Sequence, residues 1–537
     1  MTQTMHKQVT ILSSSPEVRF TGKYIEEIPL YFGKGAQDID QKRGLTINGP
    51  SDAKTDVIYT IRVGIVSTGE GTQETSSFLE FVNNNVIPSS GKKPFSTQSF
   101  PGFLKAFHCK LVLSSDYNEE LTSKEVERLL LVRNPETRIK RAAEKYAEKV
   151  GCICRRVSVP EVIICHEPEN VEENCGAGMV STKNRPVLSR ADKKTADEIR
   201  KNVQTHKILA PLSEGTQSLL DMAVHQDFRR ILKSKCLAYS IPTQILTQTI
   251  LHRLETEPTI EQSEKAEDGN KRGKRIIDRS SLAWNLAAAI YYKANHFPWK
   301  VGNLRSGTCY VGISFYQDQT KRDKTMCASL AQVFSDIGEG MVVRGHDFKW
   351  DTEVLGEPHL SETNACQILQ DAISVYKEHH DQQPPNRVVI HKSSMYLEEE
   401  RKGFMKACEE IPRYDFISVS DGREVFFYRN GEKAVLRGTC INLEDKSFLI
   451  YTKGYIPYQR AYLGPRVPKP LEITQHFGDA TRDEIAKEML ALSRLDWNTT
   501  DFTSLLPLTL KCSKKVGEIL GLVPQGSPIK EQYKFYM

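Results

Sequence analysis

The stretch FRRILKSKCLAYSIPTQ, residues 228–244, decides how the fold of this chain is interpreted. Arg229 and Lys233 stand four positions apart on a predicted helix, so both cations project from one face of it. Pro242 ends that predicted helix, and Gln244 follows two residues later. The pattern therefore predicts a polar, cationic pocket at the point where this helix ends.

A lysine from another segment completes the predicted pocket. Lys293 lies near the end of the strongly apolar predicted helix 281–294, where a buried charge needs a partner. Several cations and an amide donor that converge on one anion suit a terminal phosphate, because charge-assisted hydrogen bonds are roughly twice as strong as neutral ones. For Lys293 taken alone, an ammonium group that simply reaches water past the apolar helix stays the alternative.

Composition sets the class of protein. The chain has 537 residues, more than one ordinary core supports, which predicts two domains with connecting segments. Hydrophobic residues make up 39% and charged residues 26%, a balance that excludes a wholly disordered or fibrous chain. The net charge of +5 permits nucleic-acid binding without demanding it, so any anion site must be local.

The twelve cysteines show no zinc-finger or disulfide spacing, and the close pair Cys152 and Cys154 falls in an apolar run that we expect to be a buried strand. A reducing cytoplasm fits this usage. The first twenty residues lack a signal-peptide pattern, and no run of about 18 apolar residues occurs. Membrane insertion is therefore not expected.

Strand and helix patterns alternate in the first half of the chain. The predicted strands are 57–66, 110–114 and 157–165, the predicted helices are 77–86 and 134–150, and residues 30–50 are predicted to be an irregular lead-in. Residues 167–207 are polar and are interpreted as a long excursion. Strands interleaved with helices predict a parallel, doubly wound sheet.

The second half follows a highly charged linker at about 255–279. Predicted strands are 309–317, 340–345, 387–392, 425–429, 434–443 and 447–455, with a type I′ hairpin turn at Asn430–Gly431, and the closing helices are 482–495 and 510–520. A mixed sheet flanked by helices is typical of an RNase H-like domain. The predicted organisation is a lead-in segment at 1–50, a first domain at 51–302 and a second domain at 303–537.

Motifs spread over nearly the whole chain, about residues 25–537, resemble one protein family. They are F-R-R-x-L-K and I-P-T-Q in residues 228–244, A-W-N to P-W-K in 283–300, G-L-T-I-N-G-P in 44–50, V-G-I-V in 63–66, L-R-G-T in 436–439, P-K-P-L in 468–471 and W-N in 497–498. Those before residue 303 resemble the MID domain of prokaryotic Argonautes, and those after it resemble the C-terminal part of PIWI. The resemblance implies an α/β chain with a Rossmann-like MID domain followed by an RNase H-like PIWI domain.

The resemblance also implies a guide-binding site. In that family a basic residue, a lysine four positions on, a glutamine and a lysine of a later helix hold the 5′-phosphate of the guide, and Arg229, Lys233, Gln244 and Lys293 occupy those positions. Family members often use the C-terminal carboxylate, here that of Met537, to hold Mg²⁺ against the phosphate. A position four before Lys293 that is often polar in relatives is Ala289 here, so part of the pocket is expected to be rebuilt.

The resemblance further implies that the chain does not cut its target. PIWI nucleases hold two metal ions with clustered carboxylates. Ser314 and Ser393 stand at two of those acid positions, and a hydroxyl cannot replace a carboxylate on a hard divalent metal. Glu339 and Asp347 are interpreted as surface or turn residues rather than remaining metal ligands.

The early start of the MID motifs resembles the short class of prokaryotic Argonautes. That class implies a guide RNA, a single-stranded DNA target and a partner with an APAZ segment fused to an effector, here a TIR NADase as first choice and a sirtuin-like domain or nuclease otherwise. The sensor would act in cytoplasmic defence through NAD depletion, and a higher oligomer on target binding stays open. A Mg²⁺-dependent RNase H-like nuclease and a scaffold with a relict pocket are the alternatives.

Overall fold

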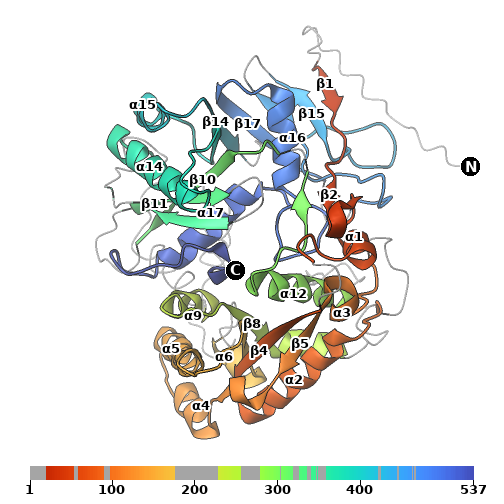
Figure 1. Ribbon diagram of the computed structural model, residues 1–537, viewed down its shortest axis with the longest axis vertical. Coiled ribbons are helices and arrows are strands. Elements are labelled where there is room, and N and C mark those ends of the chain that lie inside the picture. The colour runs from red at the N-terminus through yellow and green to blue at the C-terminus, as the bar shows by residue number, and fades with distance from the viewer. Residues whose placement is uncertain are drawn as a thin grey trace, which may run out of the picture.

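The computed structural model describes residues 20–53, 58–89, 97–175, 228–255, 278–302, 304–318, 326–334, 340–345, 348, 358–420, 425–443, 447–462, 464 and 467–537. Figure 1 shows two halves, each a sheet with helices packed on it, and α12 (Arg279–Lys293) lies where they meet. The shorter helices are α3 (Phe103–Phe107), α4 (Ser123–Leu130), α6 (Glu169–Cys175) and α10 (Gln248–Glu255). The linker expected at about 255–279 and most of the polar excursion at 167–207 lie outside the described residues.

The lower half in Figure 1 is built on a parallel sheet. Its strands in order are β5 (Cys109–Leu113), β4 (Tyr59–Ser67), β7 (Val162–Glu167) and β8 (Thr243–Thr247), and β6 (Glu119–Glu120) pairs with the end of β4. All of these pairings are parallel, which confirms the predicted doubly wound sheet.

Both faces of this sheet are covered by helices. Val162 and Ile164 of β7 belong to the core that contains α2 (Gly69–Asn83) and α12, whereas Ile163 and Cys165 pack with α5 (Pro135–Cys154) and α9 (Phe228–Cys236). Successive side chains of a strand point to opposite faces, so a strand covered on both sides is apolar at consecutive positions. This is why β7 is buried along its whole length.

The upper half contains a nine-stranded mixed sheet. Its strands in order are β1 (Gly22–Tyr24), β15 (Thr439–Asn442), β16 (Phe448–Ile450), β17 (Leu471–Gly478), β14 (Arg413–Ser420), β13 (Arg387–Lys392), β10 (Thr308–Gln317), β11 (Met326–Phe334) and β12 (Gly340–Arg344). The strands β10, β13 and β14 run parallel, and the other neighbours are antiparallel.

Helices cover the two faces of the mixed sheet. On one face α17 (Leu508–Leu520) approaches β10 so closely that a Cβ on Gly312 would lie 2.3 Å from the Thr509 carbonyl oxygen. On the same side α16 (Arg482–Leu492) packs on the core, and on the other α14 (Glu362–Glu378) and α15 (Glu398–Ala407) cover Val311 and Ile313. This is the mixed sheet flanked by helices that the sequence predicts.

The lead-in segment is more regular than expected and belongs to the upper half. Its strand β1 extends the mixed sheet, and β2 (Leu30–Tyr31) lies between β3 (Gln37–Asp38) and β9 (Lys300–Val301). Helix α1 (Gln41–Asn48) forms within the stretch predicted to be irregular. Asp40 accepts from the first backbone N–H groups of α1, and this N-cap compensates for the weak apolar pattern of the segment.

Two local predictions are wrong. Cys152 and Cys154 lie in the last turn of α5 and are half-buried, because their short apolar run continues the helical spacing of Ala143, Ala147 and Val150. Residues 425–429 form no strand beside Asn430–Gly431, so the predicted hairpin is absent there.

The hairpin of this region lies further along the chain. Strands β15 and β16 pair with each other, and the Leu443 N–H donates to the Ser447 carbonyl at 3.1 Å to close the turn between them. Phe427 instead packs against a small separate apolar cluster that contains Tyr451, and its N–H donates to the Tyr451 hydroxyl at 3.0 Å. That tertiary contact outweighs the turn preference of the Asn-Gly pair. Every helix in the described ranges is too short or too polar to span a bilayer.

Candidate functional site

The cations of α9 lie where the two halves of the molecule meet. Helix α9 ends at Cys236, earlier than the sequence predicts, and Pro242 stands one residue before β8. Lys233 is only 1% exposed, and its Nζ donates to the Thr243 carbonyl at the start of β8. Arg229 lies one turn earlier on the same helix and is half-buried.

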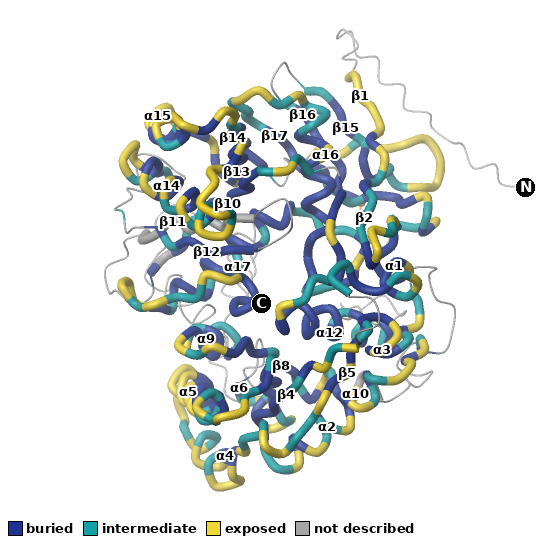
Figure 2. Tube along the Cα trace, in the orientation of Figure 1, coloured by how far each residue is buried: buried dark blue, intermediate teal, exposed yellow. Residues whose placement is uncertain are grey.

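Lys293 reaches the same place from α12, whose final residue it is. It is also 1% exposed, and its Nζ donates to the Gln244 side-chain oxygen. The Gln244 amide nitrogen donates to the Ile245 carbonyl at 2.9 Å, which turns the amide oxygen toward Lys293. Figure 2 shows α12 in dark blue, the colour of buried residues, along most of its length. The ammonium group of Lys293, at the end of this helix, therefore lies in the interior.

The charges of this cluster repel one another. Burial lowers the pKa of Lys233 to about 7, and the nearby Arg229 guanidinium adds to the effect. Burial also holds the pKa of Lys293 well below its usual value, reinforced by Lys233, Arg229 and Lys515. Neither Lys233 nor Lys293 has a carboxylate partner among the described residues. An entering anion would relieve this repulsion, because ion pairing favours the protonated lysines.

The sequence analysis missed Lys515, which α17 adds to the cluster from the upper half. Burial lowers the pKa of Lys515, Lys511 and Arg229 lower it further, and Asp496 opposes them. Lys511 forms an ion pair with Asp496, so part of the positive charge of α17 is already compensated. One sequence feature pointed to Lys515. Lys511 and Lys515 stand four residues apart, as Arg229 and Lys233 do on α9.

The end of the chain contacts both β12 and the segment just after α12. The Val342 N–H donates to the Glu531 carbonyl at 2.5 Å, and Lys534 donates to the Asn295 side chain just beyond α12. Met537 is 3% exposed and lies beside α12 in Figure 1. Its carboxylate forms no ion pair with the described cations. Ala289, one turn before Lys293, is buried and adds no polar group.

Ser314 and Ser393 each come directly after the point where the parallel pairing of β10 with β13 ends, Ser314 within β10 and Ser393 just beyond β13. The pairing of β10 with β13 ends at Ile313 and Lys392, and each serine is the next residue. Ser314 is 4% exposed, and its Oγ has no hydrogen-bond partner in the described structure, whereas Ser393 is exposed. No cluster of three metal-ligating side chains occurs within the described ranges.

The neighbourhood of Ser393 contains an internal ion pair. Both side chains of the Lys392–Glu400 pair are fully buried, with 2.6 Å between Lys392 Nζ and Glu400 Oε2. His359 also contacts Glu400, at 3.2 Å. The Glu400 carboxylate is therefore committed to Lys392 and His359 rather than open to a metal. Glu339 and Asp347 lie outside the described residues.

Solved structures of other proteins share this architecture. An Argonaute of Clostridium butyricum bound to a guide DNA and a 19-mer target DNA aligns at a TM-score of 0.58 and 16% identity over 94% of this chain and 54% of that chain. Drosophila Piwi aligns at 0.55 and 14% over 96% and 56%, and an Argonaute of A. aeolicus at 0.52 and 15% over 96% and 55%.

Comparisons at the level of sequence give no match, either to known family profiles or to curated proteins. The chain spans about half the length of the Argonaute and Piwi chains that it matches in structure. At such low identity the likeness concerns the fold. The chain therefore has the fold of the MID and PIWI portions of Argonaute and Piwi proteins.

Proposed function

We propose that this chain binds the 5′-phosphate of a guide strand through Arg229, Lys233, Gln244 and Lys293, and that Lys515 supports them. The observation that carries the proposal is a group of buried lysines with no carboxylate partner in the described structure. Buried charges are normally paired, and a phosphate supplies the missing negative charge with several acceptor oxygens. The cluster lies at the junction of the two halves, and Lys515 comes from the upper one.

The target is proposed to be read by base pairing. The guide, held at its 5′ end, would pair with a single-stranded DNA target, and the protein would contact mainly the backbones. A guide of RNA is our choice for this chain, following the family resemblance of its motifs. The Argonaute of C. butyricum was solved with a guide DNA, so a DNA guide is the direct competitor.

We further propose that target recognition is not followed by cleavage. The family resemblance places two metal-binding acids at the positions of Ser314 and Ser393, which follow the end of the β10–β13 pairing, and Glu400 is held by Lys392 and His359. Hydroxyl groups provide too little charge to hold two divalent ions. A Mg²⁺-dependent nuclease is the competing function, and a matched target that stays intact in the presence of Mg²⁺ would argue against it.

Magnesium has a different place in the proposal. The carboxylate of Met537 would hold Mg²⁺ against the guide phosphate, and the ion would supply positive charge to the phosphate oxygens. The described residues provide no cluster of carboxylates that would keep such an ion beside Lys233 and Lys293 on its own. The residues therefore fit a Mg²⁺ ion that also binds the guide phosphate, so the ion would bind only when a guide is present.

The output is proposed to belong to another protein. If this chain recognises a target without cleaving it, a second protein must carry out the response. The family resemblance points to a partner that contains an APAZ segment. A TIR NADase is the first choice, with a sirtuin-like domain or a nuclease otherwise. The chain would then serve as the sensor of a defence system based on NAD depletion.

The test of guide binding is the double variant Lys233→Ala with Lys293→Ala. Losing two charge-assisted contacts should lower copurification of 5′-phosphorylated guides by at least about 100-fold. Lys235→Ala is the matched control, because Lys235 lies on the same helix but is exposed and faces Glu144 at 3.4 Å. Unchanged guide occupancy in the folded double variant would refute the pocket and favour a scaffold function.

A further inference from the structure

Two helices from opposite halves of the molecule meet beside the cationic cluster. Helix α9 belongs to the lower half, and its Phe228 and Leu232 are buried in the core of that half. Helix α17 belongs to the upper half, where it packs on β10 and β11, and it also contacts α9. In Figure 1 the two helices lie on the facing sides of their halves. Side chains on α9 and α17 therefore influence how closely the two halves approach each other at the cluster.

An ion pair joins α9 to α17. Arg230 Nη2 lies 3.0 Å from Glu518 Oε2, and the two side chains are 24% and 36% exposed. Arg230 directly follows Arg229 on α9, and Glu518 lies three residues after Lys515 on α17. Residues three apart on a helix are neighbours on its surface, so Glu518 and Lys515 share one face of α17. The ion pair thus stands beside two of the cations assigned to the guide phosphate.

The other charges of these two helices repel one another. Helix α9 carries four basic residues and no acid, whereas α17 carries three lysines and one acid, Glu518. Burial lowers the pKa of Lys515, and the Arg229 charge on the facing helix lowers it further. Lys515 in turn adds to the effect of burial on the pKa of Lys293. Within the two helices Glu518 supplies the only negative charge, so the attraction of α17 for α9 depends on it.

We propose that Arg230 and Glu518 are positioning residues, whose ion pair holds α17 against α9 so that Lys515 reaches the guide phosphate. This role rests on the guide-binding function proposed for the cluster. A phosphate can be contacted from both helices only if they stay close, because a charge-assisted hydrogen bond needs about 2.7–2.9 Å between its heavy atoms. Without the ion pair, repulsion between Lys515 and the cations of α9 moves α17 away, and Lys515 loses its contact with the phosphate.

The sign of the effect separates this role from a direct electrostatic one. A carboxylate beside an anion site repels the anion, so loss of the Glu518 charge would by itself strengthen phosphate binding. If Glu518 acts through Arg230 and Lys515 instead, loss of its charge weakens phosphate binding. The variants should fold normally, because an ion pair between partly exposed side chains adds little to stability.

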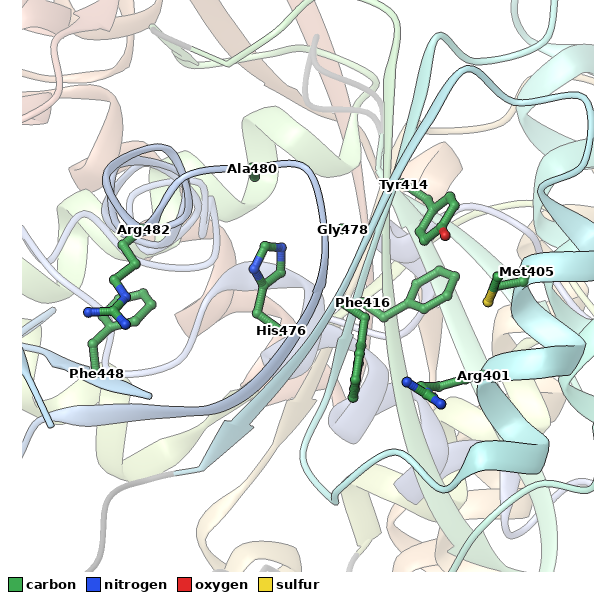
Figure 3. A pocket seen from close by; sticks show the side chains of 10 residues that line it. Arg401, Met405, Tyr414, Phe416, Phe448, His476, Gly478, Ala480 and Arg482 are labelled. Carbon is green, nitrogen blue, oxygen red and sulfur yellow. The ribbon is translucent and has the colours of Figure 1, made fainter. Parts of the chain in front are cut away.

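A hollow elsewhere on the upper half supplies a control residue. The hollow is shown in Figure 3 and has a volume of about 570 Å³, and none of the described residues that line it belongs to α9 or α17. Its Arg401 guanidinium lies 4.4 Å from the centre of the Phe477 ring. Arg401→Ala therefore removes a positive charge from the upper half without touching the junction of α9 and α17.

The test measures how tightly the full-length protein binds guides that carry a 5′-phosphate or a 5′-hydroxyl. The ratio of the two affinities reports the phosphate contact, because contacts to the rest of the strand cancel. Glu518→Gln should lower this ratio by about three- to tenfold, close to the effect of Lys515→Ala, since both variants lose the same contact. In protein that already carries Lys515→Ala, Glu518→Gln should change the ratio by less than about twofold.

A matched control is another ion pair of α9. Lys235 of α9 lies 3.4 Å from Glu144 of α5, and this pair stays within the lower half. Glu144→Gln removes a carboxylate from α9 in the same way as Glu518→Gln but leaves the junction with α17 unchanged. Both Glu144→Gln and Arg401→Ala should change the affinity ratio by less than about twofold.

Reversal of the ion pair gives a second readout. Glu518→Lys places a cation against Arg230, so it should lower the ratio at least as far as Glu518→Gln although it adds positive charge near the phosphate. Adding Arg230→Glu to this variant restores an attraction between the helices and should recover most of the lost ratio. A direct electrostatic role predicts the opposite order, because the added glutamate would repel the phosphate.

Three results would overturn the positioning role. They are an unchanged or higher ratio in Glu518→Gln, full additivity of that variant with Lys515→Ala, and no recovery when the ion pair is reversed. The phosphate pocket itself would survive these results if Lys233→Ala with Lys293→Ala still lowers the ratio. Equal affinity of the two guides for the wild-type protein would instead overturn the pocket, and the positioning role with it.

Discussion

Lys293, the last residue of α12, donates a hydrogen bond from its Nζ to the side-chain oxygen of Gln244 at the start of β8. The bond joins two segments of the lower half inside the interior. It directs the ammonium toward Lys233 and Arg229, whose charges lower the pKa of Lys293 in addition to burial. The relationship explains why this group of buried cations needs an anion.

Lys515 is predicted to contribute to binding of the 5′-phosphate from α17. Lys515→Ala should weaken a 5′-phosphorylated guide by about tenfold and a 5′-hydroxyl guide by less than about twofold, because only the phosphate gains the charge-assisted contact. Equilibrium binding of the two guides measures the difference. Lys514→Ala is the control, since its side chain leaves the helix about 100° away. Equal losses for both guides would contradict a phosphate contact.

Guide affinity is predicted to fall as the pH rises above about 7. The pKa of Lys233 is lowered to about 7 in the free protein by burial and by Arg229, so binding the phosphate requires proton uptake above that pH. The advantage of a 5′-phosphorylated guide over a 5′-hydroxyl guide should shrink by up to about tenfold per pH unit between pH 7 and 9. Lys233→Arg should flatten this slope, because arginine stays charged. An unchanged slope in that variant would exclude Lys233 as the titrating group.

The same lowered pKa predicts how the stability of the guide-free protein depends on pH. Lys233 has an ordinary pKa near 10.5 when unfolded and about 7 when folded, so the unfolded chain binds more protons between these values. The stability should therefore rise as the pH increases from about 7 toward 10, and Lys233→Met should remove part of that rise. Thermal unfolding at several pH values measures it. Identical profiles for both proteins would contradict the prediction.

Ser314→Asp is predicted not to create cleavage. One carboxylate cannot organise two metal ions, and Ser314 is 4% exposed with no hydrogen-bond partner in the described structure. The variant should instead lower the melting temperature, because a buried charge without a partner is unfavourable. Ser314→Ala should be neutral or stabilising, since it removes an unsatisfied hydroxyl. Incubation of guide-loaded protein with a matched target and Mg²⁺ measures cleavage, and a cut target in the Asp variant would refute the prediction.

The amino end of the mixed sheet is predicted to depend on Arg387. This residue is 3% exposed, donates to Asp415 at 2.7 Å from Nε and forms an ion pair with Glu488. Arg387→Met would remove the arginine from two buried carboxylates, of which Asp415 keeps only His476 as a possible cation, and should cost about 3–5 kcal/mol of unfolding free energy. Adding Glu488→Gln should recover part of that loss. A loss below about 1 kcal/mol in urea unfolding would contradict this account.

Local chemistry allowed much of the architecture to be predicted. The apolar runs of β4, β7 and β13 are typical of strands covered on both faces, and Asn134 precedes α5 as an N-cap that accepts from the Thr137 N–H at 2.9 Å. The four-residue spacing of Arg229 and Lys233 also predicted that they share a helix face. These features depend on short-range periodicity and capping.

Where short-range preference and long-range packing disagreed, the sequence was misleading. The Asn430–Gly431 pair predicts a hairpin, yet Phe427 packs against the apolar cluster around Tyr451 and the hairpin forms between β15 and β16. Helix α1 forms in a stretch of weak pattern because Asp40 caps it. Tertiary contacts outweigh turn preferences of this size.

By itself, the sequence determined that the chain alternates strands and helices, that α9 carries paired cations on one face, and that serines stand at two expected acid positions. Only the tertiary structure decided that Lys293 meets Gln244 and that Lys515 joins the cluster from α17. The reason is physical: periodicity and capping act over a few residues, whereas burial of a charge and completion of a sheet depend on segments that are distant along the chain.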